Sequence, residues 1–429
     1  MALGARLGLG RRTVTGLLVA IGQLFVDWTA AFRLFQRERF DAEALFAPGR
    51  RAVCAQLGPP DHAPFVALLD DTHFRKTGKK VHGTQWRRDP LGPKFQTNLV
   101  WSQRFLQISA AWPDAPGPPG GARAVPIDVR HCPSPPKPRK GADEEEWARY
   151  RKTKDESKIT RRAAERLHAL RQSLDQDGQA DRILVLSHDG GYTNAAVLRQ
   201  RPERTVLIGR LRKDAKLYAP PPPPAPNARG RKPLDGPERP TPDQMRKDDT
   251  LPWQTVRAFA AGKLHDFQVN VVRPVRGRGA GADDLAILIV KPLAYRLSKQ
   301  SALLYREPAY IVCTDPDLAP ADILQYFLWR LGIEGNFRDE KTLVGAGQAH
   351  VRRPASVRLV LRLPPHRRPP GPPDLPRLGP ASVAKAQTRS ASLHRQSPRP
   401  PATGTVGPGH RRGEFIRLQA KVDATRKVP

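Results

Sequence analysis

The sequence has few cysteines and no long hydrophobic run. Cys54, Cys132 and Cys313 are the only cysteines among 429 residues, widely spaced and odd in number. This usage fits a reducing cytoplasm and lacks the paired spacing of a zinc site. No stretch reaches the roughly 20 apolar residues that span a bilayer. The run from 15 to 25 is shorter and no small-residue cleavage site follows it, which argues against a signal peptide. We therefore expect a cytoplasmic protein without a membrane partner.

Acidic residues are also scarce relative to basic ones. Lys and Arg number 73 against 41 Asp and Glu, which gives a formal net charge of +32. This excess predicts a polyanionic partner, above all a nucleic acid. A protein that binds a membrane surface is the competing interpretation, but no amphipathic helix with a clean basic face is evident. Composition thus favours DNA or RNA binding.

Proline is abundant instead, and its clusters mark boundaries. The 46 prolines are about twice the usual share. We expect a helical region at 1–60, the first part of an α/β core at 61–212, a β-rich insertion with a Pro-rich loop at 213–315, a core helix at 316–353 and an Arg/Pro-rich disordered tail at 354–429. The order of strands and helices predicts an α/β fold: a mixed sheet flanked by helices.

The first region opens with a pattern that has two interpretations. Residues 11–15 precede apolar residues at Leu17, Leu18, Ile21 and Leu24. They fit the second helix of a helix-turn-helix-like element, and equally an ordinary amphipathic helix of a small bundle. Because Met1 leads directly into this pattern, we expect the beginning of this domain to be missing.

Three acidic positions lie where strands end or on a helix. Asp70 and Asp71 follow the apolar run 65–69, and Asp189 follows the run 183–186. Glu334 lies on the predicted last helix, which begins near Pro320. Carboxylates are ligands for Mg²⁺ or Mn²⁺, and three can hold two ions for phosphodiester chemistry. Asp71 (or Asp70), Asp189 and Glu334 are therefore the candidate triad, although an Asp after a strand is usually a turn residue.

The last helix adds cations to this set. At about 100° per residue, Phe327, Arg330, Glu334 and Lys341 fall on one stripe. A carboxylate between two cations suits a group that holds a metal beside phosphates, and surface ion pairing is the plainer alternative. Arg75 and Lys76, after the first Asp, predict a phosphate-contacting patch or a solvated charged loop.

Together these segments resemble the DDE transposases of bacterial insertion sequences. The resemblance is carried by Asp70-Asp71-Thr72, by Asp189-Gly190-Gly191-Tyr192-Thr193-Asn194 and by Phe327-x2-Arg330-x3-Glu334-x6-Lys341. The third motif is similar to that of the branch with a β-rich insertion before the Glu. The similarity covers roughly residues 10 to 353.

The resemblance implies a ribonuclease-H-like catalytic core with two Mg²⁺ or Mn²⁺ ions. Asp71, Asp189 and Glu334 would be both the catalytic residues and the metal ligands, with Asp70 as the alternative first ligand. Arg330 and Lys341 would contact DNA, as would Arg75 and Lys76 of the basic patch. The implied partners are terminal inverted repeats and target DNA, bound by a homodimer in a bacterial, nucleoid-associated setting. The alternatives are a non-catalytic DNA-binding remnant and a nuclease that cuts without joining.

Two features depart from that family. The motif usually opens with Tyr, where this chain has Phe327 with Tyr326 beside it. Relatives also continue into another apolar helix, whereas the composition here changes abruptly after Val357. We hypothesise that the reading frame shifts near residues 353–360, which would leave the core without a packing layer and put the activity of this copy in doubt.

Overall fold

The computed structural model describes most of the chain up to Arg362. The described residues are 13–36, 41, 43–89, 92–93, 95–115, 117–223, 233–296, 300–349 and 351–362. The chain divides into two units, residues 1–87 with 100–366 and residues 88–99 with 367–429. The first unit holds the fold and the candidate site. Among the described helices, none is both long and apolar enough to cross a lipid bilayer.

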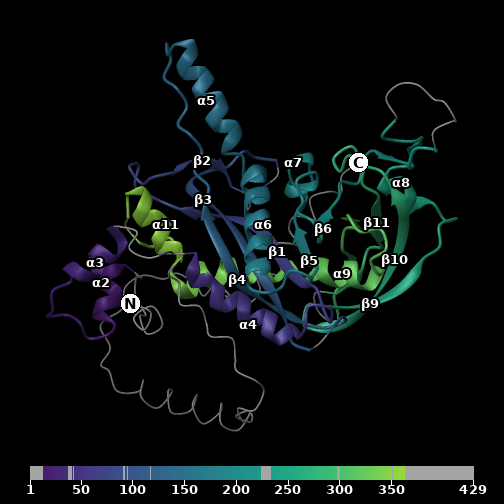
Figure 1. Cartoon of the computed structure of the whole chain (residues 1–429), viewed down its shortest axis with the longest axis horizontal. Coiled ribbons are helices and arrows are strands. Elements are labelled where there is room, and N and C mark those ends of the chain that lie inside the picture. Colours follow the sequence, from purple (N-terminus) through teal and green to yellow (C-terminus); the bar gives the residue numbers. More distant parts are fainter. Residues whose placement is uncertain are drawn as a thin grey trace, which may run out of the picture. The chain divides into compact units, whose positions relative to one another are not determined.

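A ten-stranded mixed sheet forms the centre of the first unit (Figure 1). Its order is β2-β3-β1-β5-β6-β14-β11-β10-β9, with β4 also paired to β3. β1 runs antiparallel to β3 and parallel to β5, which is parallel to β6. The strands of this sheet are β1 (Phe65–Arg75), β2 (Gln85–Arg88), β3 (Leu99–Pro113), β4 (Ala122–His131), β5 (Leu184–His188), β6 (Thr205–Arg210), β9 (Gln254–Ala260), β10 (Lys263–Val275), β11 (Leu285–Val290) and β14 (Ala309–Cys313).

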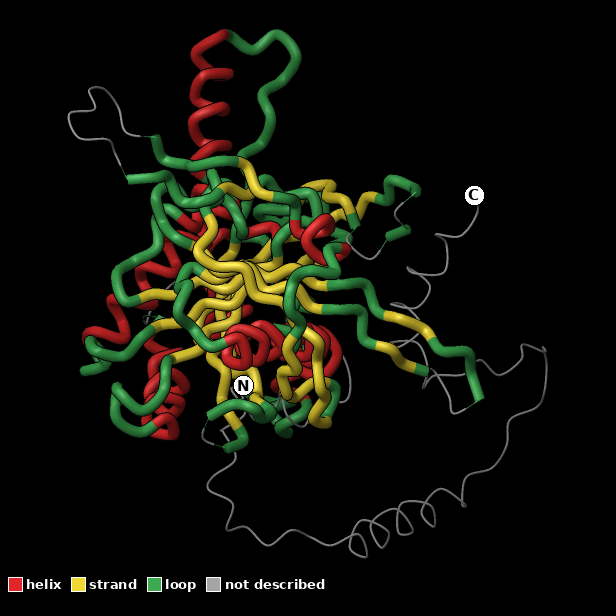
Figure 2. Tube along the Cα trace, turned by 90° about the vertical axis from the view of Figure 1, so that its right-hand side faces the viewer, coloured by secondary structure: helices red, strands yellow, loops and turns green. Residues whose placement is uncertain are grey.

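Helices cover both faces of the sheet, so the strands lie between helical layers in Figure 2. α6 (Ile159–Gln176) buries Ala163, Leu167, Leu170 and Leu174 on one face, at the spacing of an amphipathic helix. α9 (Pro320–Trp329) and α10 (Gly332–Asp339) pack on the other face. The remaining helices are α2 (Val14–Val19), α3 (Thr29–Gln36), η1 (Ala44–Phe46), α4 (Ala47–Leu57), α5 (Glu144–Glu156), η2 (Gly190–Tyr192), α7 (Ala195–Leu198), α8 (Pro242–Lys247), η3 (Glu340–Val344) and α11 (Pro354–Arg362).

The expected mixed sheet flanked by helices is confirmed, but the β-rich insertion is not a separate body. β9, β10, β11 and β14 all fall within 213–315, and they extend the central sheet. Only the short pairs β7 (Leu217–Tyr218) with β8 (Glu238–Arg239) and β12 (Ala294–Tyr295) with β13 (Leu304–Tyr305) stand apart from it. The apolar run 285–290, buried at every position, is typical of a strand covered on both faces.

The two ends of the unit also differ from expectation. α2 ends at Val19, so Ile21 and Leu24 lie beyond the helix, and Leu24 is exposed. At the other end, 354–362 form α11, which buries Val357 and Leu359. The tail expected from 354 therefore begins with an ordered amphipathic helix. Residues 363–429, where the proposed frameshift would have its main effect, lie outside the described residues.

Candidate active site

Asp70 and Asp71 lie inside β1, not beyond its end, so their side chains point to opposite faces. Val66 and Leu68 pack in the apolar cluster that contains α9 and α10 residues. Phe65, Ala67 and Leu69 pack in the cluster that contains α6 residues. Alternation therefore places Asp70 on the α9/α10 face and Asp71 on the α6 face.

The Asp70 carboxylate meets the predicted Arg330 and Glu334. Arg330 Nη1 lies 3.2 Å from Asp70 Oδ2, and Arg330 Nη2 lies 3.9 Å from Glu334 Oε1. Both carboxylates thus contact the same guanidinium, whose side chain is 9% exposed. Burial raises the pKa of Asp70 to about 7. The nearby Asp71 and Asp189 carboxylates raise this pKa as well, and the Arg330 guanidinium lowers it by less than the other effects raise it. The site thus combines a half-exposed Glu with a buried Asp that binds its proton far more tightly than usual.

Asp189 reaches this same face through the strand register. In the parallel pair of β1 and β5, Leu69 is opposite His188, so Asp70 and Asp189 are the next residues on each strand. Val185 of β5 belongs to the α9/α10 cluster, and Asp189 keeps an extended backbone, so alternation points it to that face as well. The electrostatic effect of Asp189 on Asp70 agrees with this placement.

His188, beside Asp189, is a structural residue. Its ring is fully buried, with Nδ1 3.0 Å from the Asp189 carbonyl oxygen. Burial lowers the pKa of His188 to about 4, so it is neutral at pH 7. A Cβ on Gly209 would lie 2.2 Å from its Cε1 atom, so the neighbouring strand β6 needs glycine there to make room for the ring.

The last helix is interrupted, which changes the expected stripe. α9 ends at Trp329 and α10 begins at Gly332, with a turn at residues 330–331 between them. Phe327, Arg330 and Glu334 stay together, since the Arg330 guanidinium is 5.8 Å from the Phe327 ring and close to Glu334. Lys341 instead lies in the π-helical turn η3, with Nζ 5.5 Å from the Phe74 ring centroid. The helical run ends at Gly345, which closes η3 in the left-handed conformation.

One further carboxylate on this face was not predicted. Gln107 is opposite Asp70 in the β1–β3 register, and its side chain hydrogen-bonds Glu340 at the start of η3. Burial raises the pKa of Glu340 to about 7. A π-helical turn is a feature often found at functional sites, but sequence periodicity gives no sign of it. Glu340 is thus a second partly buried acid on the face that holds Asp70.

Asp71, the preferred first ligand from the sequence, has different partners. Arg104 donates from Nε to Asp71 Oδ2 at 2.6 Å and from Nη2 to Oδ1 at 2.9 Å. The Tyr192 hydroxyl donates to Oδ1 at 2.7 Å. Burial alone would raise the pKa of Asp71, but these bonds outweigh it and hold that pKa below its ordinary value. The structure therefore brings Asp70, not Asp71, together with Arg330 and Glu334.

The other predicted DNA contacts are partly engaged by the protein itself. Lys76 Nζ donates to the carbonyl oxygens of Gly347 and Ala349, and burial lowers its pKa to about 8. Arg75, the last residue of β1, is exposed. Arg330 is buried between two carboxylates. Of the four predicted cations, Arg75 and Lys341 are exposed, whereas Lys76 and Arg330 are at least partly buried.

The donor chemistry suits a hard divalent cation, since all the acids offer oxygen. In the ranges that the structure describes, however, no three His, Cys, Asp or Glu side chains gather closely enough to hold a metal ion. Asp70 and Glu334 share a guanidinium instead. Asp70, Asp189 and Glu334 thus lie on one face without forming a finished metal site, and the preferred first acid, Asp71, lies on the other.

Comparison with known proteins assigns the family. The family described as "DDE superfamily endonuclease" matches residues 2–265, more than half of the chain. The match includes Asp70, Asp71 and Asp189 and ends before Glu334. A search of curated proteins found no match. Membership implies phosphodiester hydrolysis on a nucleic-acid substrate, with divalent metals as the typical cofactors of the family. On the matched span and the mixed sheet together, the chain belongs to the DDE superfamily endonucleases.

Proposed function

We propose that this chain is a DNA transposase that cuts at the ends of its element and joins them to target DNA. The observation that carries the proposal is the Arg330 guanidinium in contact with both Asp70 and Glu334. Glu334 lies outside the family match, yet it shares a face of the sheet with Asp70 and Asp189 of the matched span. An excess of 32 positive charges supports DNA as the partner.

We assign the catalytic carboxylates to Asp70, Asp189 and Glu334. They would hold two Mg²⁺ or Mn²⁺ ions, which when bound activate an attacking hydroxyl and stabilise the leaving oxygen. Asp70 is supplied by the central strand β1 and Asp189 by the end of its parallel neighbour β5. Glu334 comes from α10, which packs against β1 and β4.

The remaining cations would bind and orient the DNA. Arg330, held at the carboxylates by its own ion pairs, is placed to contact a phosphate next to the scissile bond. Arg75 and Lys341 lie on β1 and η3, the elements that flank the site. A homodimer that pairs two element ends, in a bacterial nucleoid-associated setting, completes the proposal.

The test is a strand-transfer assay with the full chain. A donor plasmid carries the DNA that flanks the coding sequence, a second plasmid is the target, and Mg²⁺ or Mn²⁺ is added. We expect excised donor and joined product, and loss of both with Asp189→Asn or Glu334→Gln. Cleavage without any joined product would instead identify a nuclease. DNA binding with no cleavage by the wild-type chain would identify a non-catalytic remnant.

Metal binding provides a readout that does not depend on turnover. Titration calorimetry with Mn²⁺ should show binding to the wild-type chain that Asp70→Asn weakens and Asp71→Asn leaves in place. Equal binding by all three proteins would refute the assignment of Asp70 as a ligand.

A further inference from the structure

A cavity of ≈ 350 Å³ lies between α6, β4 and α11, and none of the candidate catalytic acids lines it. Its wall contains four arginines, Arg130, Arg162, Arg166 and Arg358, and a single carboxylate, Glu165. Ligand cavities in proteins begin at about 300 Å³, so this one can hold a small group. Its lining is strongly cationic, which calls for an explanation.

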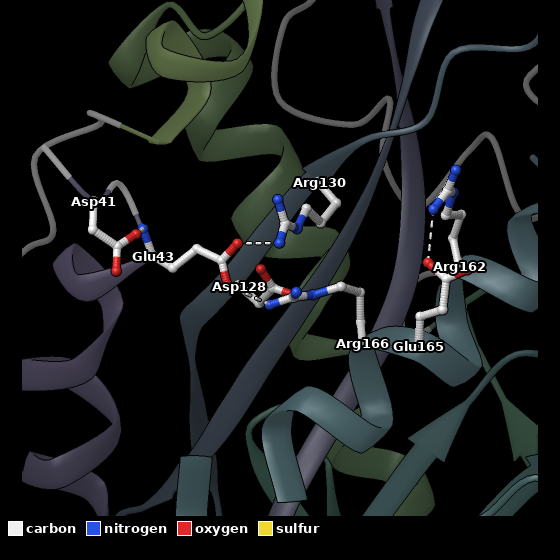
Figure 3. A network of polar contacts seen from close by, with 7 residues as sticks. All are labelled: Asp41, Glu43, Asp128, Arg130, Arg162, Glu165 and Arg166. Atoms are coloured by element: carbon white, nitrogen blue, oxygen red, sulfur yellow. Dashed lines mark hydrogen bonds and ion pairs between the residues drawn. The ribbon is translucent and has the colours of Figure 1, made fainter. Parts of the chain in front are cut away.

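Two of the arginines are held by acidic side chains, the buried Asp128 and the partly exposed Glu43, as Figure 3 shows. Arg166 donates from Nε to Asp128 Oδ2 at 2.5 Å and from Nη2 to Glu43 Oε2 at 3.3 Å. Arg130 donates from Nη2 to the other Glu43 oxygen. A guanidinium has five N–H donors, so each of these groups keeps donors for a further acceptor. Glu43 and Asp128 are not part of the cavity lining, and they act as supports that orient both guanidinium planes.

The other two arginines stand nearer the opening. Arg162 lies one helical turn before Arg166 on α6, and like charges at this spacing repel each other. Its Nη1 donates to Glu165 Oε2 at 2.7 Å, and its side chain is 45% exposed. Arg358 approaches from α11. Two helices and a strand thus direct positive charge into one cavity.

The histidine beside the arginines adds a neutral partner. His131 also lines the cavity, and its Nε2 is buried without a hydrogen-bond partner among the described residues. Burial, with smaller contributions from the nearby His82, Arg87 and Arg358, lowers the pKa of His131 to about 3. The imidazole is therefore uncharged and can donate or accept one hydrogen bond. The cavity is therefore lined by guanidinium and imidazole groups that can donate N–H hydrogen bonds to a bound group.

We propose that this cavity binds a phosphate group of the DNA backbone, away from the cleavage site. A tetrahedral oxyanion accepts several guanidinium N–H bonds at once, and such charge-assisted bonds are the strong ones. Glu165, the single lining carboxylate, is 54% exposed and pairs with Arg162, while Glu43 and Asp128 pair with Arg130 and Arg166 from outside the lining. The proposal does not depend on which acids cut DNA, so it is tested without cleavage. Free phosphate shares the same chemistry, and the experiment separates the two sources.

Arg162→Gln is the test variant and Arg161→Gln is its matched control. Arg161 is the adjacent residue of α6, is 48% exposed, pairs with Asp155 and does not line the cavity. Both ion pairs are largely solvated, so neither change should unfold the protein. DNA binding is measured in EDTA with a short duplex over a series of NaCl concentrations. Inorganic phosphate is titrated separately by calorimetry.

We expect Arg162→Gln to weaken duplex binding about tenfold. It should also lower the slope of log K against log salt by about 0.9, the value for one lost phosphate contact. Arg161→Gln should leave both quantities unchanged. Glu165→Gln removes the opposing charge and should strengthen binding, so it provides a gain-of-affinity variant that does not depend on the first. Equal behaviour of Arg161→Gln and Arg162→Gln, with no gain from Glu165→Gln, would overturn the proposal. Loss of inorganic phosphate binding with unchanged duplex binding would overturn the DNA assignment.

Discussion

Asp70 and Asp71 are chemically identical neighbours on one strand, and the two faces of the sheet give them opposite properties. On the α9/α10 face, Asp70 has one cationic partner at 3.2 Å, and burial raises its pKa to about 7. On the α6 face, Asp71 accepts two bonds from Arg104 and one from Tyr192, and its pKa is lowered. The three side-chain bonds to Asp71 hold it and its partners in place. Asp70 accepts one bond from the Asp71 backbone N–H at 2.8 Å and the longer contact from Arg330, so its carboxylate keeps acceptor sites for another ligand. The face of the sheet on which each aspartate lies, and not its residue type, therefore decides whether it has a structural role or is available for catalysis.

The same contrast extends to the groups around each acid. Arg104 and Tyr192 come from β3 and η2, and they tie the central strand to its neighbours. Arg330 and Glu334 come from the α9–α10 turn and α10, which can shift relative to a sheet more easily than a strand can. We infer that the Asp71 cluster sets the position of β1 and that the Asp70 face uses this fixed position for catalysis.

The largest predicted effect is on cleavage. Asp70→Asn should lower the rate of metal-dependent DNA cleavage about 10³-fold, since a metal ligand contributes several kcal/mol to transition-state stabilisation. Asp71→Asn, assayed where it is folded, should retain most of the activity. Plasmid nicking with Mn²⁺ compares the two rates directly. If Asp71→Asn abolishes cleavage in a folded protein while Asp70→Asn does not, the roles of the two faces are reversed.

Stability should show the opposite ranking. Asp71→Asn removes a charge from beneath Arg104, and breaking a partly buried ion pair from one side costs about 3 kcal/mol. Asp70→Asn should cost less than about 1 kcal/mol, because burial already disfavours the charged form of Asp70. Urea unfolding monitored by circular dichroism gives both free energies. Equal losses for the two variants would contradict the comparison.

The pH dependence of stability offers a third contrast. The pKa of Asp70 is raised in the folded state, so the folded chain holds a proton that the unfolded chain has lost. Stability from this group is fully present below about pH 4 and declines as the pH rises towards 7. The wild type should therefore lose about 2 kcal/mol relative to Asp70→Asn between these values, with allowance for partial exposure of the carboxyl.

Urea unfolding in EDTA at pH 5 and pH 7.5 measures this difference. Burial also raises the pKa of Glu340 to about 7. Because Glu340 is present in both proteins, its effect on the pH dependence of the unfolding free energy cancels in the comparison. A constant difference between wild type and Asp70→Asn across this range would show that Asp70 ionises normally.

Much of the site was predictable because its signals are local. The Arg330-x3-Glu334 spacing places two side chains one helical turn apart, and they remain in contact although a turn interrupts the helix. Asp189 follows a short buried strand, and the end of such a strand opens to the sheet edge. These inferences need only periodicity and strand ends, which neighbouring residues determine.

The choice between Asp70 and Asp71 could not be made from the sequence. All five residues before them are apolar and buried, so the run shows no alternation that would tell one face from the other. The partners that distinguish the two acids, Arg104 and Arg330, are 33 and 260 positions away in the chain. For the same reason the extension of the sheet by β9 to β11 and β14 was not predicted, since strand pairing is non-local.

The arginine-lined cavity is an extreme case of this limit. Its four arginines come from β4, α6 and α11, and their supporting acids Glu43 and Asp128 come from different parts of the chain. In the sequence each of these residues resembles an ordinary surface charge. Only the packing of α11 on β4 brings the set together.

The smallest predicted effect isolates the Tyr192 hydroxyl. Tyr192→Phe removes the 2.7 Å bond to Asp71 Oδ1 but keeps the ring and both Arg104 bonds. A hydrogen bond to a charged group contributes about 1.5 kcal/mol. Tyr192→Phe should therefore lower the free energy of unfolding by roughly half as much as Asp71→Asn does. Tyr150→Phe, on α5, which buries no residue, is the matched control and should be neutral.

Because Asp71 would still be anchored by Arg104, cleavage by Tyr192→Phe should stay within about threefold of wild type. A fall in cleavage as large as that of Asp70→Asn would mean that the α6 face takes part in the chemistry, and the separation of the two faces would fail.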